Sequence, residues 1–274
     1  MSKATLNKRV KYFEKTKPYR TQIEYALSRE DAALKNIGDK TDKAGLKYLD
    51  LAEEMTFIIS NCIILNSVSL SILKVRNDAA LNEGRKSAYK ALVYLEKTVS
   101  PLIDAAYSEY ESMLLEITSV DAQRRYNIIR KLGLSIQLLK NAFGVYSKWR
   151  WAFVEMEGRY AAVAKNIIDL KKAVGNTDPR SIDYEPTVRH LRLIKKLLQN
   201  AADRYRQKYE SFSRNSVDIK MGIQFLESLR RIHIFLGERK NVETTKKIID
   251  VWKMRLDGVM DKQGEESLKI LDNG

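Results

Sequence analysis

The sequence contains few residues that break helices and few that build metal or redox sites. In 274 residues it has four prolines, twelve glycines, one cysteine and two histidines. So few turn-forming residues favour long helices over many short strands. A single cysteine cannot form a disulfide within the chain, which is typical of a reducing compartment. We therefore predict an all-α protein.

The residues that usually carry chemistry do not occur in the patterns that enzymes use. Neither His190 nor His233 has a second histidine or a glutamate at metal-ligand spacing, and no glycine cluster forms a phosphate-binding loop. Glu53 and Glu54 are adjacent, so their side chains diverge on a helix. We therefore expect a non-enzymatic protein with no catalytic site, no cofactor, no metal and no small-molecule substrate.

The longest uncharged stretch, residues 55–73, raises the question of a membrane span. Its nineteen residues come close to the length of about 20 that crosses a bilayer. However, it contains two asparagines and four serines, and charged residues lie at both ends. A helix that is apolar nearly all round is usually surrounded by other helices. We interpret this stretch as a buried core helix, with a membrane span as the alternative.

The strongest periodic pattern runs through residues 119–174. From Leu132 to Val174 every seventh residue is apolar, and a companion row changes phase near Tyr146. Such spacing is typical of a helix, and roughly 54 helical residues would span about 80 Å. We predict an elongated bundle of about seven or eight helices organised on this one long central helix.

Three glycines lie within the predicted central helix. Gly133, Gly144 and Gly158 should each cost about 1 kcal/mol relative to alanine. Gly144 lies beside the phase change, which is compatible with a kink or with a change of neighbouring helices. We favour the change of neighbours because it needs no distortion, so the helix would present two successive apolar seams.

The clearest break in the chain is the Gly-Asn-Thr-Asp-Pro sequence at residues 175–179. A glycine that ends a helix is followed there by turn-forming residues. We place a boundary between an N-terminal bundle, residues 1–175, and a C-terminal three-helix segment, residues 176–274, that packs on it. One continuous domain is the alternative. Pro18 similarly predicts that a short first helix ends before it and a second begins there.

The net charge of +14 is concentrated in two segments. Residues 1–20 hold seven basic residues and one acidic residue, and residues 186–240 hold thirteen and five. Such a field attracts anionic partners, and a basic strip can follow the phosphates of nucleic acid or of an anionic membrane leaflet. A solvated face with snorkelling stems is the alternative. The candidate anion-binding face comprises Arg189, Arg192, Lys195, Lys196, Arg204, Arg206 and Lys208.

A second candidate contact lies inside the central pattern. Residues 148–151 alternate cationic and aromatic side chains, as base-stacking surfaces do. Helical geometry places Trp149 in the apolar row, whereas Trp151 points roughly 200° away. An exposed tryptophan in a helix is typical of a contact surface, although a helix buried on several sides would hide it. We predict that Trp151, Lys148 and Arg150 contact a partner.

These patterns together predict a cytoplasmic scaffold, adaptor or structural protein that acts through protein–protein contacts. Its partner would be another protein or, in a coiled-coil-like oligomer, a second copy of the chain. We expect no secretory signal, because residues 1–20 contain no apolar segment of sufficient length. The alternative function is to bind nucleic acid or an anionic membrane leaflet through the candidate anion-binding face and the basic amino terminus.

Overall fold

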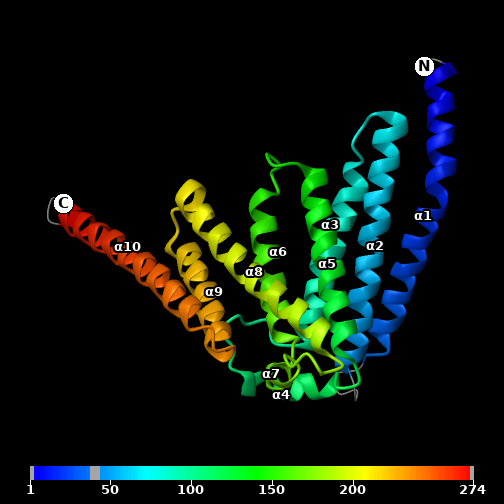
Figure 1. Ribbon diagram of the computed structural model, residues 1–274. Helices are drawn as coiled ribbons and strands as arrows, with labels where there is room; N and C mark the ends of the chain where they lie inside the picture. The colour runs from blue at the N-terminus through cyan, green and yellow to red at the C-terminus, as the bar shows by residue number, and fades with distance from the viewer. Residues whose placement is uncertain (1–2, 38–43, 272–274) are drawn as a thin grey trace. The chain divides into compact units, whose positions relative to one another are not determined.

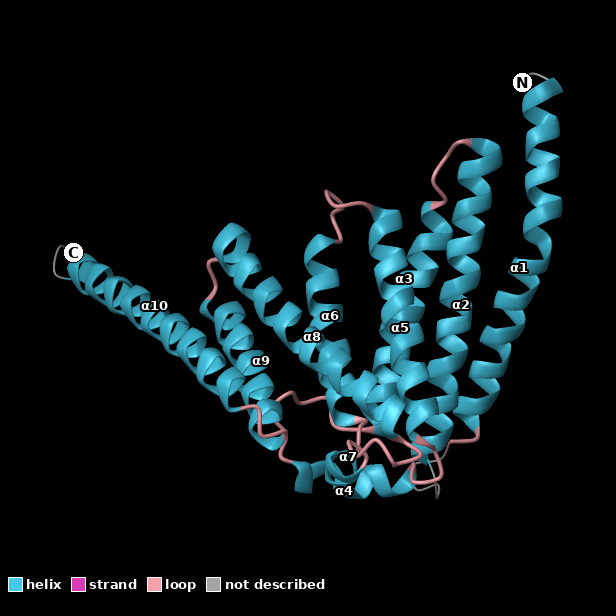
Figure 2. Cartoon of the chain, viewed as in Figure 1, coloured by secondary structure: helices cyan, strands magenta, loops and turns pink. Residues whose placement is uncertain are grey.

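The computed structural model describes residues 3–37 and 44–271, and every regular element in these ranges is a helix (Figure 2). The all-α class is therefore confirmed for the described part of the chain. By their contacts the residues form two units. Unit 1 comprises residues 1–101 and 105–190, and unit 2 comprises residues 102–104 and 191–274. The domain boundary expected after residue 175 stays a prediction.

Unit 1 contains seven complete helices and the start of an eighth in the part of the chain that the structure describes (Figure 1). They are α1 (Lys3–Lys35), α2 (Ala44–Leu73), α3 (Asp78–Thr98), α4 (Tyr107–Glu116), α5 (Ala122–Phe143), α6 (Arg150–Asn166), α7 (Leu170–Gly175) and the first turns of α8 (Tyr184–Lys208).

Helix α2 contains the whole uncharged stretch of residues 55–73, and it packs on α1, α3, α4 and α5. Its side chains at Leu49, Met55, Ile58 and Ile59 have no exposed surface, and neither does the Cys62 thiol. By length and composition, α2 is the one helix among the described residues that could cross a membrane. The core helix of a bundle passes the same test, so this property does not decide between the two interpretations.

The prediction of a single helix over residues 119–174 is wrong. The segment forms α5, α6 and α7, which are separated by connections at residues 144–149 and 167–169. Gly144 has φ +87°, a conformation that favours glycine, and its N–H donates a hydrogen bond to the Lys140 carbonyl at the end of α5. Tyr146, placed in the predicted seam, is 98% exposed. The change of phase therefore marks the connection between two helices that pack against each other.

The α5–α6 pair depends on a close approach at Gly133. Tyr160 on α6 donates a hydrogen bond from its hydroxyl to the Ile129 carbonyl of α5, at 2.8 Å. A Cβ atom added at Gly133 would lie 2.2 Å from that hydroxyl oxygen. Since real Cβ atoms do not approach so closely, glycine at 133 creates the space that the tyrosine fills.

The prediction that a first helix ends before Pro18 is also wrong, because α1 continues through this residue. Helix α1 is attached to α3 through Glu30, whose side chain is 1% exposed. The Lys90 ammonium lies 2.6 Å from its carboxylate, and the Tyr94 hydroxyl donates to it as well. The described residues contain ten α-helices, more than the seven or eight expected, chiefly because the central segment is divided.

Unit 2 contains most of α8 together with three further elements. These are a π-helical turn η1 (Tyr209–Ser213), α9 (Ser216–Phe235) and α10 (Arg239–Leu271). Its core includes Trp252 of α10, which is 3% exposed and packs on Gly222 of α9. Tyr205 of α8 stacks on Phe225 of α9, with 5.6 Å between the ring centroids.

Candidate functional site

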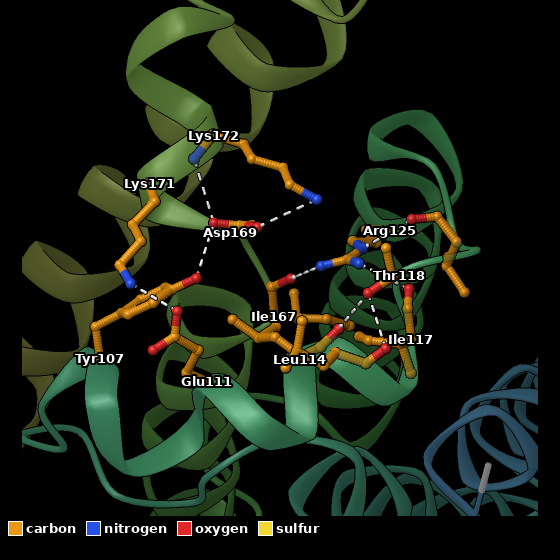
Figure 3. A network of polar contacts seen from close by, with 12 residues as sticks. Tyr107, Glu111, Leu114, Ile117, Thr118, Arg125, Ile167, Asp169, Lys171 and Lys172 are labelled. Atoms are coloured by element: carbon orange, nitrogen blue, oxygen red, sulfur yellow. Dashed lines mark hydrogen bonds and ion pairs between the residues drawn. The ribbon is translucent and has the colours of Figure 1, made fainter.

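A polar cluster in unit 1 is centred on Arg125 of α5, which is 8% exposed (Figure 3). Its guanidinium donates to three backbone carbonyls: Nε to Val120 at 3.0 Å, Nη1 to Ile167 at 3.0 Å and Nη2 to Ile117 at 2.7 Å. Ile117 and Ile167 follow the last turns of α4 and α6. A cation is favourable at such helix C-termini, so Arg125 ties α4, α5 and α6 together.

Helix α4 is also attached to α7 beside this cluster (Figure 3). The Tyr107 hydroxyl donates to the Asp169 carboxylate at 3.0 Å, and the Lys171 ammonium lies 2.6 Å from Glu111. Asp169 also caps α7, since its carboxylate accepts from the backbone N–H of Lys172. Burial raises the pKa of Tyr107, and the hydrogen bond to Asp169 raises it further. The hydroxyl therefore stays protonated and acts as a structural donor.

A small cleft of about 130 Å³ adjoins Arg125 and includes His190 of α8. The His190 side chain is 2% exposed, and its Nε2–H donates to the Ala164 carbonyl at 3.0 Å. Burial, partly offset by that hydrogen bond and reinforced by the charge of Arg125, lowers the pKa of His190 to about 4. A neutral histidine bonded to the backbone and an arginine bonded to three carbonyls both hold the helices in place.

The described residues contain no group of three or more His, Cys, Asp or Glu side chains that could hold a metal ion. The Cys62 thiol is on α2 and is buried. Burial raises its pKa to about 12, with a smaller contribution from the charge of Glu83. A thiol with such a pKa is a poor nucleophile at neutral pH. The expectations of no metal, no cofactor and no enzyme stay predictions.

A groove between α2 and α5 has a volume of about 380 Å³ and opens to solvent. Three of its apolar side chains are well exposed: Phe57 at 43%, Leu134 at 58% and Leu138 at 41%. Lys131 and Glu53 also line it. Sequence analysis missed this groove, although Leu134 and Leu138 form an apolar pair at helical spacing outside the main row. Its lining residues are Glu53, Thr56, Phe57, Ser60, Ile128, Lys131, Leu134, Ser135 and Leu138.

The structure places the candidate partner contact at the connection between α5 and α6. Trp149 precedes α6, and the Arg85 guanidinium of α3 lies over its ring at 3.8 Å. Arg150 lies over the ring of Trp151 at 4.5 Å, and Lys148 is exposed. Both tryptophans are partly buried. Residues 148–151 are thus brought together, and their role in partner binding stays a prediction.

The candidate anion-binding face lies along α8, but its residues do not share one side of that helix. At about 100° per residue, the seven positions spread over more than half of the circumference. Several already have partners: Arg189 pairs with Glu185, Lys195 with Glu238 at 2.6 Å, Lys208 with Asp218 at 2.8 Å, Arg206 lies 5.1 Å from the ring of Trp252, and Arg204 bonds Gln207.

Arg192 and Lys196 are the exposed basic residues of this face for which the described part of the chain provides no ion pair. Lys195 has a well-defined role within unit 2. Burial alone would raise the pKa of its partner Glu238, but hydrogen bonds from Lys195, Asn241 and His233 outweigh burial and lower that pKa to about 2. The carboxylate is therefore charged at neutral pH and holds α8 beside the start of α10. Anion binding by this face stays a prediction.

The model of the TP0443 family matches residues 8–259. No curated protein and no solved structure matches the chain.

Proposed function

We propose that this chain, which belongs to the TP0443 family, is a non-enzymatic helical scaffold or adaptor that binds an amphipathic helix of another protein. The observation that carries the proposal is the open apolar groove between α2 and α5. A cytoplasmic location and the capacity to associate with a second copy belong to the same proposal. The single cysteine supports the location, and the aromatic content supports association with another chain.

The groove suits helix-in-groove recognition. Phe57 comes from α2, whereas Leu134 and Leu138 come from α5, where they are four residues apart and share one side of the helix. A partner helix with apolar residues at positions i, i+4 and i+7 would place them between these walls. Lys131 lies at the same groove and would pair with an acidic residue of the partner, whereas Glu53 is already paired with Arg124 at 2.7 Å.

The apolar walls supply part of the binding free energy. Complete burial of a Leu or Phe side chain contributes about 1.5–3 kcal/mol, and these three are roughly half exposed in the free chain. Each would therefore contribute about 1 kcal/mol, to which the partner's own anchors add a similar amount. Such a groove is sufficient for a specific contact when the partner helix is already ordered.

A site-specific cross-linker tests this proposal. A photoreactive residue at position 134 of the full chain, expressed in its native cell, should form one discrete product with a partner protein. The matched control is position 115, since Leu115 is also an exposed leucine of unit 1, on α4. A peptide copied from the cross-linked helix should bind the wild type and lose roughly tenfold or more in affinity with Leu134→Asp, but not with Leu115→Asp.

Other outcomes would overturn the proposal. Identical products at positions 134 and 115 would mean that the groove has no selectivity. A peptide that binds Leu134→Asp as tightly as the wild type would place the contact elsewhere. A product that contains only a second copy of the chain would replace the adaptor with self-association through the same groove.

A further inference from the structure

Three segments of unit 1 meet at one end of the unit, and we call them together the basic tip. They are residues 6–20 of α1, residues 74–78 between α2 and α3, and residues 144–151 between α5 and α6. Figure 1 shows the first half of α1 and the two connections at the same end of this unit. Segments far apart in sequence thus form one surface.

Specific contacts hold the basic tip together. The Asn77 side-chain amide donates to the Tyr12 hydroxyl of α1 at 2.9 Å. Arg76 donates from Nη1 to the Phe143 carbonyl at the end of α5, at 3.1 Å. The cation–π contact between Arg85 and Trp149 adds a link from α3 to the second connection. The two connections and α1 are therefore positioned relative to one another before any ligand arrives.

Apolar side chains project from the basic tip into solvent. The most exposed lie at the centres of the two connections, and α1 adds a row at positions i, i+4 and i+7. A folded protein normally keeps such protruding aliphatic and aromatic groups singly scattered, so their grouping at one end indicates a contact surface. The exposed fractions are 62% for Val75, 75% for Val145, 98% for Tyr146, and 54%, 50% and 56% for Leu6, Val10 and Phe13.

The charge around these apolar groups is strongly positive. The three segments of the basic tip contain ten lysines or arginines and two acidic residues, Glu14 and Asp78. Asp78 is already paired with Arg76 at 2.7 Å. Lys74 and Lys148, one in each connection, are exposed. The apolar tips are therefore surrounded by cationic side chains that face solvent.

We propose that the basic tip docks on an anionic membrane leaflet, with the two connections and the first half of α1 inserted at the level of the lipid headgroups. Exposed apolar and aromatic side chains flanked by lysine and arginine match the lipid–water interface, where the apolar groups enter the acyl boundary. The cationic side chains are then attracted by anionic headgroups. Duplex DNA, whose bases are already stacked, would use the charge but would leave the aliphatic side chains of Val75 and Val145 in water.

A hollow between the two connections offers room for a lipid headgroup. It has a volume of about 670 Å³, and its lining includes Arg76, Lys148 and Ser147. Asp78 also lines it, but its pairing with Arg76 leaves the hollow with a net positive lining. These groups can donate hydrogen bonds to a phosphate, which is the chemistry shared by all phospholipid headgroups.

Sedimentation of the full chain with vesicles tests the proposal. The chain should bind vesicles of phosphatidylcholine containing one quarter phosphatidylglycerol and should not bind pure phosphatidylcholine at about 0.1 M salt. The double variant Lys74→Glu/Lys148→Glu should weaken binding to the anionic vesicles by roughly tenfold or more. The matched control Arg192→Glu/Lys196→Glu changes two exposed basic residues of α8 in unit 2, and it should bind as the wild type does.

The apolar contribution and the location of the contact are tested separately. Tyr146→Ser should weaken binding several-fold, whereas the control Ile182→Ser, at a position that is 97% exposed between α7 and α8, should not. Tryptophan fluorescence should shift to shorter wavelength on binding and should be quenched by brominated lipid. This change would come from Trp149 and Trp151, because Trp252 is 3% exposed in unit 2. Circular dichroism checks that each variant is folded.

Three results would overturn the proposal. The first is no binding of the wild type to anionic vesicles. The second is loss of binding with the α8 control variant but not with the variants of the basic tip. The third is binding to duplex DNA without binding to either vesicle. Each of these results leaves the groove proposal standing, because neither the groove residues nor its cross-linking test involves the basic tip.

Discussion

The substitution Gly133→Ala distinguishes the α5–α6 hairpin from a single long helix over the same residues. In an uninterrupted solvent-exposed helix, Gly133→Ala would stabilise the protein by about 1 kcal/mol, because glycine is a poor helix former. In the structure, the added Cβ would lie 2.2 Å from the Tyr160 hydroxyl oxygen and 2.7 Å from Cζ of the same ring. The two arrangements therefore predict opposite signs.

The size of the expected loss of stability follows from the displacement of the Tyr160 ring. The ring has to move, which costs about 1–3 kcal/mol for overpacking in a close-packed core. The movement also lengthens or breaks the 2.8 Å hydrogen bond to the Ile129 carbonyl, at a cost of about 1–3 kcal/mol for a buried polar group left unpaired. After the gain in helix propensity is subtracted, Gly133→Ala should destabilise the protein by about 3 kcal/mol. The melting temperature should fall by about 6–12 °C.

Urea unfolding followed by circular dichroism measures this effect. The matched control is Gly175→Ala at the end of α7, where nothing lies within 4 Å of the added Cβ, so its stability should be unchanged or higher by up to about 1 kcal/mol. In a Tyr160→Phe background the colliding oxygen is absent, and Gly133→Ala should cost about 1 kcal/mol less. A Gly133→Ala protein as stable as the wild type would refute the hairpin packing.

Three further predictions concern buried polar groups. Arg125→Lys should lower the free energy of unfolding by about 2–4 kcal/mol, because one ammonium cannot donate to all three carbonyls. The control Arg130→Lys, on the exposed side of α5, should change it by less than about 0.5 kcal/mol in the same urea assay. With a folded-state pKa of about 4, His190 is neutral while the unfolded chain takes up a proton below about pH 6.5, so wild-type stability should fall as the pH drops from about 6.5 to 4. His190→Leu should remove about 3 kcal/mol of that fall, and equal pH slopes in urea unfolding would contradict the assignment. Cys62, with its pKa near 12, should react with a thiol reagent far more slowly in native buffer than in urea, and equal rates would show that the thiol is accessible.

The sequence was sufficient to predict the helical class but not the number of helices. Apolar periodicity reports which side of a helix is buried, and the same stripe results when one helix meets two neighbours or when two helices meet each other. Residues 119–174 belong to the second case. The change of phase at Tyr146, two residues after Gly144, lies within the connection between α5 and α6. An undistorted helix that changes neighbours would produce the same change of phase, so the pattern alone does not reveal the turn.

The surface was harder to predict than the class because it depends on partners from distant parts of the chain. The sequence places Lys195 and Lys208 on one helix, but it does not show that Glu238 and Asp218 would pair with them. Similarly, the exposure of Leu134 depends on α2 leaving one side of α5 uncovered. The basic tip combines three segments whose proximity only the fold reveals, although the charge of the amino terminus was evident from the start.

The contact between Gly133 and Tyr160 also constrains the evolution of the sequence within this family. A side chain at position 133 and a large ring at position 160 exclude each other, so neither position can drift alone without loss of packing. Related chains that keep the hairpin should therefore carry a small residue at one position whenever the other is large. This paired variation across twenty-seven positions would identify the hairpin in a relative from its sequence alone.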